Sequence, residues 1–320
     1  MYKVRAKGIS AALSSAAFLG LTPVFGKLAI NLGFSPLAVA ALRTSMAAGL
    51  ILIIMILFYR PYLYIFPVGL IGCLLAGAIN GLGSILYYLA LERLDASVGQ
   101  TLYLTYPFFV AIWLILDSQP PRLLTIIRMG MAGLSLFLIT SLPEHSTDLI
   151  GIVLMLGSAA LYALHLPINQ RVLYEVPAPT VTLYTLMAMT IVVMPAYILF
   201  DRQWIMFSVS WWPVIGLTIV TLLSRLALFF GVKHIGGMQT ALLGLSELIV
   251  TILFSYIFLN ENLVWTQWLG AAGLGFSLLL VQLEAPHPIH NSSKGGWLSW
   301  IRPPDLPRDI PTDIPWGPHE

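Results

Sequence analysis

The chain has 320 residues, of which 58% are hydrophobic and only 9% are charged, with a formal net charge of +2. Ordinary soluble domains carry roughly 25% charged residues, so a soluble globular fold is excluded for most of this length. No basic cluster is dense enough to indicate a nucleic-acid partner. The single Cys73 excludes a disulfide within the chain, and no metal site is predicted.

Ten apolar stretches follow one another, each long enough to cross about 30 Å of hydrocarbon as a helix. The connectors between them are short and contain glycine, proline, aspartate or asparagine. The first stretch follows the basic segment 1–7 and is a full span in length, so it is interpreted as a membrane helix and not as a cleaved signal. The sequence therefore predicts an all-α integral membrane protein with ten transmembrane helices, at residues 8–31, 36–58, 66–90, 96–116, 123–142, 149–172, 179–200, 209–231, 237–259 and 264–283.

Lysine and arginine are unevenly distributed between the two predicted membrane faces. The opposite loops carry Arg93 and Arg202, or four cations when Lys27 and Arg43 near the helix ends are added. The face that holds the N-terminus carries eight: Lys3, Arg5, Lys7, Arg60, Arg122, Arg128, Arg171 and Lys233. Because cytoplasmic loops are enriched in these residues, both termini are predicted to be cytoplasmic, in a multi-pass protein of the cell inner membrane.

The two halves of the chain resemble one another. Three matches lie 143 residues apart and one lies 140 apart, namely Gly8 with Gly151, 15–17 with 158–160, Pro36 with Pro179, and 130–134 with 270–274. This predicts a first repeat at 1–147 and a second at 148–283, each with five spans. Since five is odd, the repeats are inverted, which is typical of secondary transporters. A duplication kept only for folding is the alternative.

Residues 284–320 are rich in proline, serine, aspartate and histidine, and are predicted to be a mostly disordered cytoplasmic tail. Within it, the segment 297–301 contains two tryptophans, which prefer the membrane interface. It is predicted either to rest at the membrane surface or to have no role.

Several segments carry a family resemblance, in the expected order along the chain: 25–30, 36–43, 88–96 and 247–273. They resemble the EamA repeat of the drug/metabolite transporter superfamily, over about residues 1–283. The resemblance implies a transporter with a central cavity built from spans 1–4 and 6–9, and with spans 5 and 10 at the periphery. Leu248 stands where the family often has a proline after the carboxylate of span 9, so no proline hinge is carried over to this position.

Glu247 is the only charged residue between Ile235 and Asn260. It lies about 15 Å into the ninth span by helical rise, near the midplane, where a carboxylate is costly and by default functional or paired. Arg225 in the eighth span lies about 9 Å deep, so a Glu247–Arg225 pair is predicted. Three interpretations remain open: a static structural pair, a pair in which substrate or a proton competes for one partner, and an Arg225 that extends to the membrane surface. Glu247 is also the candidate for proton coupling, because burial favours a neutral carboxyl group.

The predicted substrate-binding residues are Glu247, Arg225, Tyr106, Tyr103, Asn80, His165 and Gln100. Tyr106 matches Glu247 at a shift of 141 residues, and Tyr103 lies one turn before it. Tyrosine walls with a few polar groups suit an aromatic or amphipathic small molecule, although each tyrosine is equally explained by packing. His165 is more typical of a hydrogen-bonded core histidine than of a proton relay. Lys27 and Arg43 lie near the outer ends of spans 1 and 2 and can reach either the headgroups or the mouth of a cavity, with extension to the headgroups preferred. Arg43 also matches the typical arginine of the EamA repeat, which implies a structural role in the first repeat. Pro23 and Pro167 are predicted to kink the first span of each repeat.

No phosphate-binding GxxxxGK[ST] loop and no HExxH motif occur, so ATP drive, a metal and cofactors are not predicted, and the chain is not predicted to be an enzyme. The function predicted is a secondary transporter that moves a small metabolite, such as an amino acid or an amphipathic compound, by alternating access. The alternatives are a membrane-embedded enzyme of lipid or polyprenyl metabolism and a non-transporting scaffold. The predicted partners are the small-molecule substrate, the lipid bilayer and protons, and the protein is a monomer or a homodimer.

Overall fold

The computed structural model describes residues 2–117, 121–139, 148–201 and 210–259, with residues 265, 268–270, 272–273, 276, 280, 297–298 and 301. Every regular secondary-structure element within these ranges is a helix. Besides a short 3-10 turn at Arg60–Leu63, the helices are α1 (Tyr2–Gly20), α2 (Thr22–Asn31), α3 (Pro36–Phe58), α4 (Pro67–Arg93), α5 (Ala96–Tyr103), α6 (Tyr106–Leu116), α7 (Leu123–Ile139), α8 (Leu149–Leu173), α9 (Ala178–Phe200), α10 (Trp212–Ile235), α11 (Gly237–Gly244) and α12 (Glu247–Leu259).

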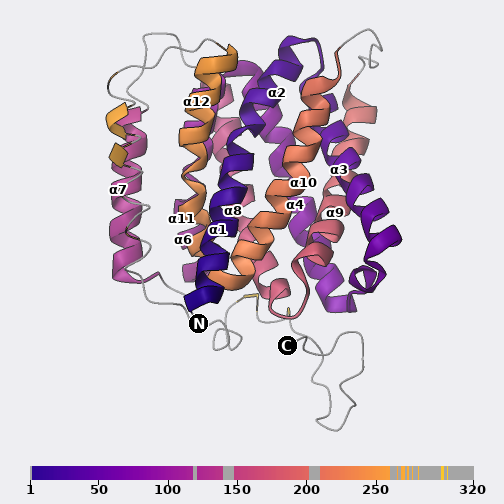
Figure 1. Cartoon of the computed structure of the whole chain (residues 1–320). Helices are drawn as coiled ribbons and strands as arrows, with labels where there is room; N and C mark the ends of the chain where they lie inside the picture. The colour runs from indigo at the N-terminus through magenta and orange to yellow at the C-terminus, as the bar shows by residue number, and fades with distance from the viewer. Residues whose placement is uncertain are drawn as a thin grey trace.

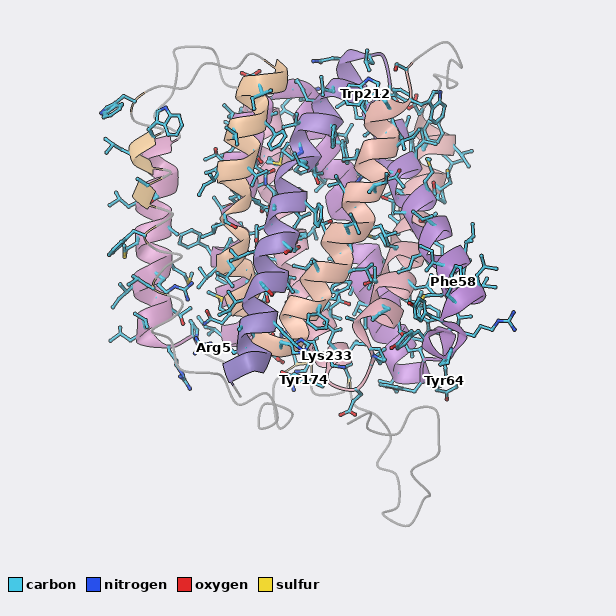
Figure 2. The ribbon with its side chains drawn as sticks, viewed as in Figure 1. Arg5, Phe58, Tyr64, Tyr174, Trp212 and Lys233 are labelled. Carbon is cyan, nitrogen blue, oxygen red and sulfur yellow. The ribbon has the colours of Figure 1, made fainter. Side chains whose placement is uncertain are left out.

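The helices run roughly parallel or antiparallel to one axis and form a single bundle (Figure 1). Arg5, Tyr64, Tyr174 and Lys233 lie at one end of this bundle and Trp212 lies at the other (Figure 2). We call these the N-terminal end and the far end. Helix α7 stands at the edge of the bundle in Figure 1.

Seven helical stretches of the described residues are long and apolar enough to cross a membrane: Arg5–Asn31, Pro36–Phe58, Pro67–Arg93, Val98–Leu116, Leu149–Leu173, Ala178–Phe200 and Trp212–Ile235. They correspond to the predicted spans 1–4 and 6–8. The predicted span 5 is the shorter apolar helix α7, and span 9 is divided into α11 and α12. Most of span 10 and of the tail, together with Arg202, lies outside the described residues. The structure thus shows a multi-pass helical membrane protein, without establishing ten spans.

The outer surface of the bundle is apolar. Large side chains such as Phe58, Leu123 and Phe200 are 74%, 73% and 77% exposed, and many other leucines and isoleucines are more than half exposed. Contiguous apolar surface of this extent is unfavourable in water and is the surface that a lipid-embedded protein presents.

The internal repeat is visible in how the helices pack. The hydroxyl group of Ser15 in α1 donates a hydrogen bond to the carbonyl oxygen of Ser224 in α10 at 2.9 Å. The matching Ser158 in α8 donates to the carbonyl oxygen of Gly83 in α4 at 2.8 Å. Ser15 and Ser158 are 143 residues apart, and Gly83 and Ser224 are 141 apart. The first helix of each half therefore packs, in the same register, on the third span of the other half.

Two glycines permit these close contacts. A Cβ on Gly8 would meet the side chains of His234 and Ile235 at 2.8 Å, in the last turn of α10. A Cβ on Gly151 would meet Leu94 at 2.9 Å and Arg93 at 3.2 Å, at the end of α4. The contact at Gly8 lies at the N-terminal end and that at Gly151 at the far end, so the two halves begin at opposite ends of the bundle. This agrees with an inverted repeat.

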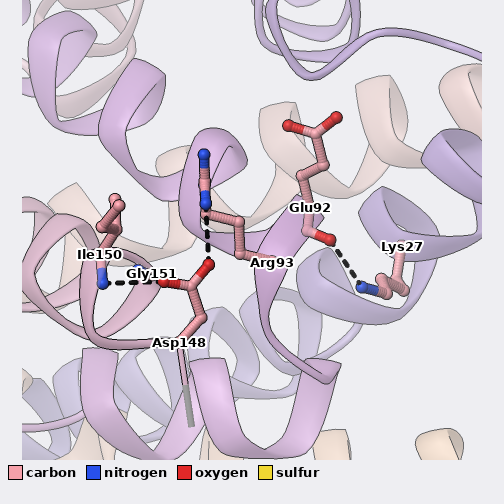
Figure 3. Close-up of polar contacts among 6 residues, drawn as sticks. All are labelled: Lys27, Glu92, Arg93, Asp148, Ile150 and Gly151. Atoms are coloured by element: carbon pink, nitrogen blue, oxygen red, sulfur yellow. Dashed lines mark hydrogen bonds and ion pairs between the residues drawn. The ribbon is translucent and has the colours of Figure 1, made fainter. Parts of the chain in front are cut away.

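At the far end, polar contacts tie α4 to its neighbours (Figure 3). The ammonium group of Lys27 donates to the carbonyl oxygens of Leu91 at 2.8 Å, Leu94 at 2.9 Å and Glu92 at 3.4 Å, the last of which is drawn in Figure 3. These carbonyl groups end α4 and lack partners within the helix. The prediction that Lys27 extends to the headgroups was therefore wrong, because the end of α4 offers it acceptors.

Asp148 joins the two halves at the same end. Its carboxylate forms an ion pair with Arg93 at 2.8 Å and caps α8 by accepting from the backbone N–H groups of Ile150 and Gly151 (Figure 3). The hydrogen bond from Arg93 is the main cause that lowers the pKa of Asp148 below its usual value, and the two backbone N–H groups act in the same direction.

At the N-terminal end a buried ion pair joins the halves. The Arg171 guanidinium in α8 lies 2.8 Å from the carboxylate of Asp117 at the end of α6, and the two side chains are 3% and 0% exposed. The backbone N–H of Leu298 donates to the same carboxylate at 3.1 Å. Leu298 is 0% exposed and Ile301 is 5% exposed, so these tail residues lie in the bundle and not on the membrane surface as predicted.

The two prolines that were predicted to kink the first span of each half lie in different local structure. Helix α1 ends at Gly20, and Pro23 lies in the first turn of α2 after a turn at Leu21. Pro167 lies inside α8, which is continuous across it. Membrane helices tolerate an interior proline when neighbouring groups replace the lost hydrogen bond, so the first span is interrupted beside Pro23 but not beside Pro167.

Candidate functional site

The fourth span of each half is interrupted at the same place. Helix α5 gives way to α6 at Leu104–Thr105, and α11 gives way to α12 at Leu245–Ser246. These turns lie 141 residues apart, and Tyr106 and Glu247 are the first residues of the helices that follow. Broken membrane helices expose backbone groups and helix ends where transporters bind their substrates. The second break forms although Leu248 replaces the expected proline, so proline is not required for it.

A cavity of about 40 Å³ lies beside these breaks and between the two halves. Helices α1–α5 contribute from the first half, and α8, α10 and α12 from the second, whereas α9 contributes no lining residue. The residues that line the cavity are Leu19, Thr22, Arg43, Asn80, Gly83, Ser84, Tyr87, Gln100, Tyr103, Ser158, Tyr162, Arg225 and Glu247.

Arg225 is 5% exposed and is held from behind by two partners. One guanidinium nitrogen lies 3.1 Å from Nε2 of His165, whose Nδ1 contacts the carbonyl oxygen of Tyr162. Because a carbonyl group only accepts and an arginine only donates, His165 is the neutral tautomer with its proton on Nδ1. Because an arginine only donates, the Asn80 amide is assigned with its oxygen toward Arg225, where it accepts at 2.8 and 2.6 Å. Arg225 therefore presents a positive charge to the cavity in a defined orientation and does not extend to the membrane surface.

Arg43 supplies a second cation to the same cavity. Its guanidinium donates to the hydroxyl groups of Ser84 at 2.8 Å and Thr221 at 3.2 Å, and lies 4.9 Å from the centre of the Tyr88 ring. The side chain is 7% exposed, so it does not extend to the headgroups, the preferred interpretation, and lies at the cavity, which was the alternative. Ser84 belongs to the first half and Thr221 to the second, so Arg43 bridges the two.

Glu247 is 1% exposed, and no ion pair joins it to Arg225. The predicted pair was therefore wrong, although both side chains line one cavity. Within the described part of the chain, Oε1 of Glu247 has no hydrogen-bond partner, and neither have Nε of Arg43 and the hydroxyl groups of Thr22 and Tyr162. All four residues line the cavity. Buried polar atoms are usually satisfied, so this concentration indicates a space that receives water or a ligand.

Tyrosine rings form the wall beside these polar groups. The ring of Tyr103 lies 5.1 Å from Tyr87, 5.2 Å from Tyr162 and 5.8 Å from Tyr106, measured between centroids. The hydroxyl group of Tyr87 donates to Oε1 of Gln100 at 3.2 Å. Tyr106 lies behind the wall, where its hydroxyl group donates to the carbonyl oxygen of Ala241 at 3.0 Å.

The structure thus brings five of the seven predicted site residues to one cavity: Glu247, Arg225, Tyr103, Asn80 and Gln100. Tyr106 and His165 support the wall from outside it. Sequence reasoning missed Thr22, Tyr87, Ser158 and Tyr162. Helical spacing from Asn80 to Tyr87, and from Ser158 to His165, is the signal that links these residues to ones already considered.

Comparison with known proteins agrees with this architecture. The model of the EamA-like transporter family matches residues 6–141 and again residues 149–283. The chain belongs to this family. It is therefore an EamA-type membrane transporter of the drug/metabolite transporter superfamily, with two family repeats.

Two relatives are also described as transporters. An uncharacterized transporter of Synechocystis sp. is 24% identical over 234 residues, which cover 68% of this chain and 67% of that protein. An uncharacterized transporter of Archaeoglobus fulgidus is 24% identical over 199 residues, covering 62% and 71%. A crystal structure with 15% identity superposes with a TM-score of 0.67 and covers 89% of this EamA chain and 100% of that chain, which supports the fold.

Proposed function

We propose that this EamA transporter is a secondary transporter that moves a small metabolite with both an amino and a carboxylate group across the cytoplasmic membrane, outward and by alternating access. The observation that carries the proposal is a buried carboxylate without a partner and two guanidinium groups around one cavity between the halves.

The charges of the cavity favour a carboxylate-bearing substrate. Arg43 and Arg225 share the space with a single acidic residue, Glu247. Like charges that share a buried site destabilise one another, so an anion that binds between the two guanidinium groups relieves this repulsion. Guanidinium groups also bind carboxylates in a geometry that Lys cannot match. A positively charged amino group then complements Glu247, and the tyrosine wall suits an aromatic or amphipathic side chain.

The size of the cavity supports a conformational cycle. A volume of about 40 Å³ has room for only a few waters, since one water requires roughly 10–15 Å³ measured in this way. Drug-sized ligands occupy sites of roughly 300–1,000 Å³. Binding therefore requires the halves to separate around the site. Their inverted packing gives two equivalent ways to do so, one at each end of the bundle.

The proposed orientation in the membrane rests on the cation count. The excess of Lys and Arg at the N-terminal end supports placing that end, and both termini, in the cytoplasm. Protons are the proposed coupling ion, because a carboxyl group in a buried site can exchange a proton as the cavity opens to either face.

A metabolite-toxicity screen of cells that overexpress the full chain tests the proposal. Expression is expected to increase tolerance to one or more amino acids or related compounds, and Glu247→Ala is expected to abolish that gain. Glu92→Gln serves as the control, because Glu92 is an exposed carboxylate at the far end of α4. Flux of the selected compound into proteoliposomes follows. An altered compound would indicate an enzyme, and an absence of flux in every case would indicate a scaffold, and either result contradicts the proposal.

A further inference from the structure

Residues of the C-terminal tail lie inside the bundle at its N-terminal end. Leu298 and Ile301 are 0% and 5% exposed and belong to the same buried cluster as Val172, Leu173 and Val176 around the end of α8. Side chains this deeply buried are docked against the bundle. Trp297, in contrast, is 42% exposed.

One anchor of this segment is a backbone hydrogen bond. The N–H of Leu298 donates to Oδ1 of Asp117 at 3.1 Å. The other carboxylate oxygen, Oδ2, accepts from the Arg171 guanidinium at 2.8 and 3.3 Å. Asp117 ends α6 in the first half, and Arg171 lies in α8 of the second half. The tail therefore binds at the ion pair that joins the halves.

The side chains of the segment also contact both halves. An ideal Cβ on Gly72 of α4 would lie 3.6 Å from the Ile301 side chain and 2.6 Å from Val172 of α8, so Ile301 lies where α4 and α8 meet. The ring of Trp297 lies 6.4 Å from that of Trp113 in α6.

We propose that Trp297, Leu298 and Ile301 form a tail latch that holds the N-terminal end of the transporter closed. Separation of α4 and α6 from α8 at this end would break the contacts on at least one side and expose Leu298 and Ile301 to water. The docked tail thus favours conformations in which the central cavity is closed at this end. Release of the latch accompanies each opening there, so the affinity of the tail for its site controls how often the transporter opens.

Docking is tested first, by thiol labelling of the full chain in membranes. Cys73 is the only cysteine, so Leu298→Cys and Trp297→Cys are each made with Cys73→Ala and treated with a water-soluble maleimide. The thiol of Leu298→Cys is expected to react at least tenfold more slowly than that of the adjacent, exposed Trp297→Cys. Equal rates would overturn the proposal.

Closure is tested with the native Cys73, which is 0% exposed near the N-terminal end of α4. Leu298→Glu and, independently, Ile301→Glu are expected to raise the labelling rate of Cys73 at least fivefold, because a buried carboxylate expels the tail. Leu298→Met conserves volume and is expected to keep Cys73 protected. The latch would be overturned if Cys73 were labelled at the same rate in both glutamate variants as in the unaltered chain. No substrate is involved, so this outcome is separate from any failure of transport.

Discussion

Glu247 combines deep burial with an oxygen, Oε1, that has no hydrogen-bond partner among the described residues. Its position in the first turn of α12 stabilises a negative charge through the helix dipole, whereas burial opposes it. We expect Glu247 to change its protonation state when the cavity gains or loses water. The proton, and not a fixed partner, is therefore the species that we expect to exchange with substrate at Glu247.

The first prediction concerns this exchange. Glu247→Gln keeps the shape of the side chain but has no proton to release, so transport of the selected compound is expected to lose its response to a proton gradient. The measurement is uptake into proteoliposomes with and without an imposed pH difference, and Glu92→Gln is expected to respond normally. A full response in Glu247→Gln would show that another group, or none, carries the proton.

The second prediction concerns Gly244 in α11. A Cβ here would collide with the hydroxyl group of Tyr106, which bonds to Ala241 and supports the tyrosine wall. Gly244→Ala is expected to lower the free energy of unfolding by about 1–3 kcal/mol, as overpacking does. Gly49→Ala in α3 meets no atom within 4 Å and is expected to be neutral or slightly stabilising. Thermal unfolding in detergent compares them, and a Gly244→Ala protein as stable as Gly49→Ala would exclude the steric argument.

Depth, polarity and the internal repeat together selected Asn80, Gln100, Tyr103, Arg225 and Glu247, which line one cavity in the structure. Hydroxyl-bearing residues were harder to predict. Serine and threonine in a membrane helix often bond to their own backbone, as Thr44 does to Ala40. Residue type therefore did not distinguish the hydroxyl group of Thr22, which lines the cavity.

At the scale of the helices, length and hydropathy predicted most ends of spans 1 to 9 within a few residues, but not where spans 1, 4 and 9 break. The turn before Tyr106 has a proline beside it at Pro107, whereas the matching turn before Glu247 has none. The second turn is instead fixed by packing between helices. Thr251 of α12 donates a hydrogen bond to the carbonyl oxygen of Gly20, at the end of α1, at 2.8 Å. Such a contact between distant helices leaves no local pattern in the sequence.

The third prediction concerns the start of α8. The pKa of Asp148 is lowered in the folded protein, so the stability it contributes is present above the usual carboxyl pKa of about 3.9 and is lost as the pH falls through the lower, folded value. Asp148→Ala is expected to lower the unfolding temperature at pH 7, and this difference is expected to shrink below about pH 4. Asp148→Asn keeps a side chain that can cap α8 but loses the charge. Comparing it with Asp148→Ala therefore separates the contribution of the ion pair with Arg93 from that of the cap. If the difference in unfolding temperature between Asp148→Ala and the unaltered chain stays constant down to pH 3, the Asp148 carboxylate is not the group that stabilises the start of α8.

At the scale of the whole molecule, the two halves are joined by charge at both ends. The pair at the far end is exposed, whereas Asp117 and Arg171 are buried. The sequence placed Arg171 only by its charge in the orientation count, because nothing local shows that Asp117 and Arg171 meet. The tryptophans of the tail suggested either contact with the membrane surface or no role, whereas Leu298 is buried in the bundle.

The fourth prediction uses this buried pair. Arg171→Met leaves the Asp117 carboxylate buried with fewer donors and is expected to cost about 3–5 kcal/mol of stability. The double variant Asp117→Leu with Arg171→Met removes both charges and is expected to recover most of this loss. Unfolding curves of the single and double variants give the comparison. A single variant as stable as the unaltered chain would show that the pair contributes little.

The exchange of first helices between the halves has a consequence for how the protein is made. While the ribosome synthesises the chain, α1 enters the membrane long before α10, the helix on which its glycine and serine contacts lie. The early helices must wait in lipid, partly unassembled, until α10, which ends at residue 235 of 320, has been inserted. Neither half is then expected to mature alone. Separately encoded halves should be degraded when produced singly and protected from proteolysis when produced together.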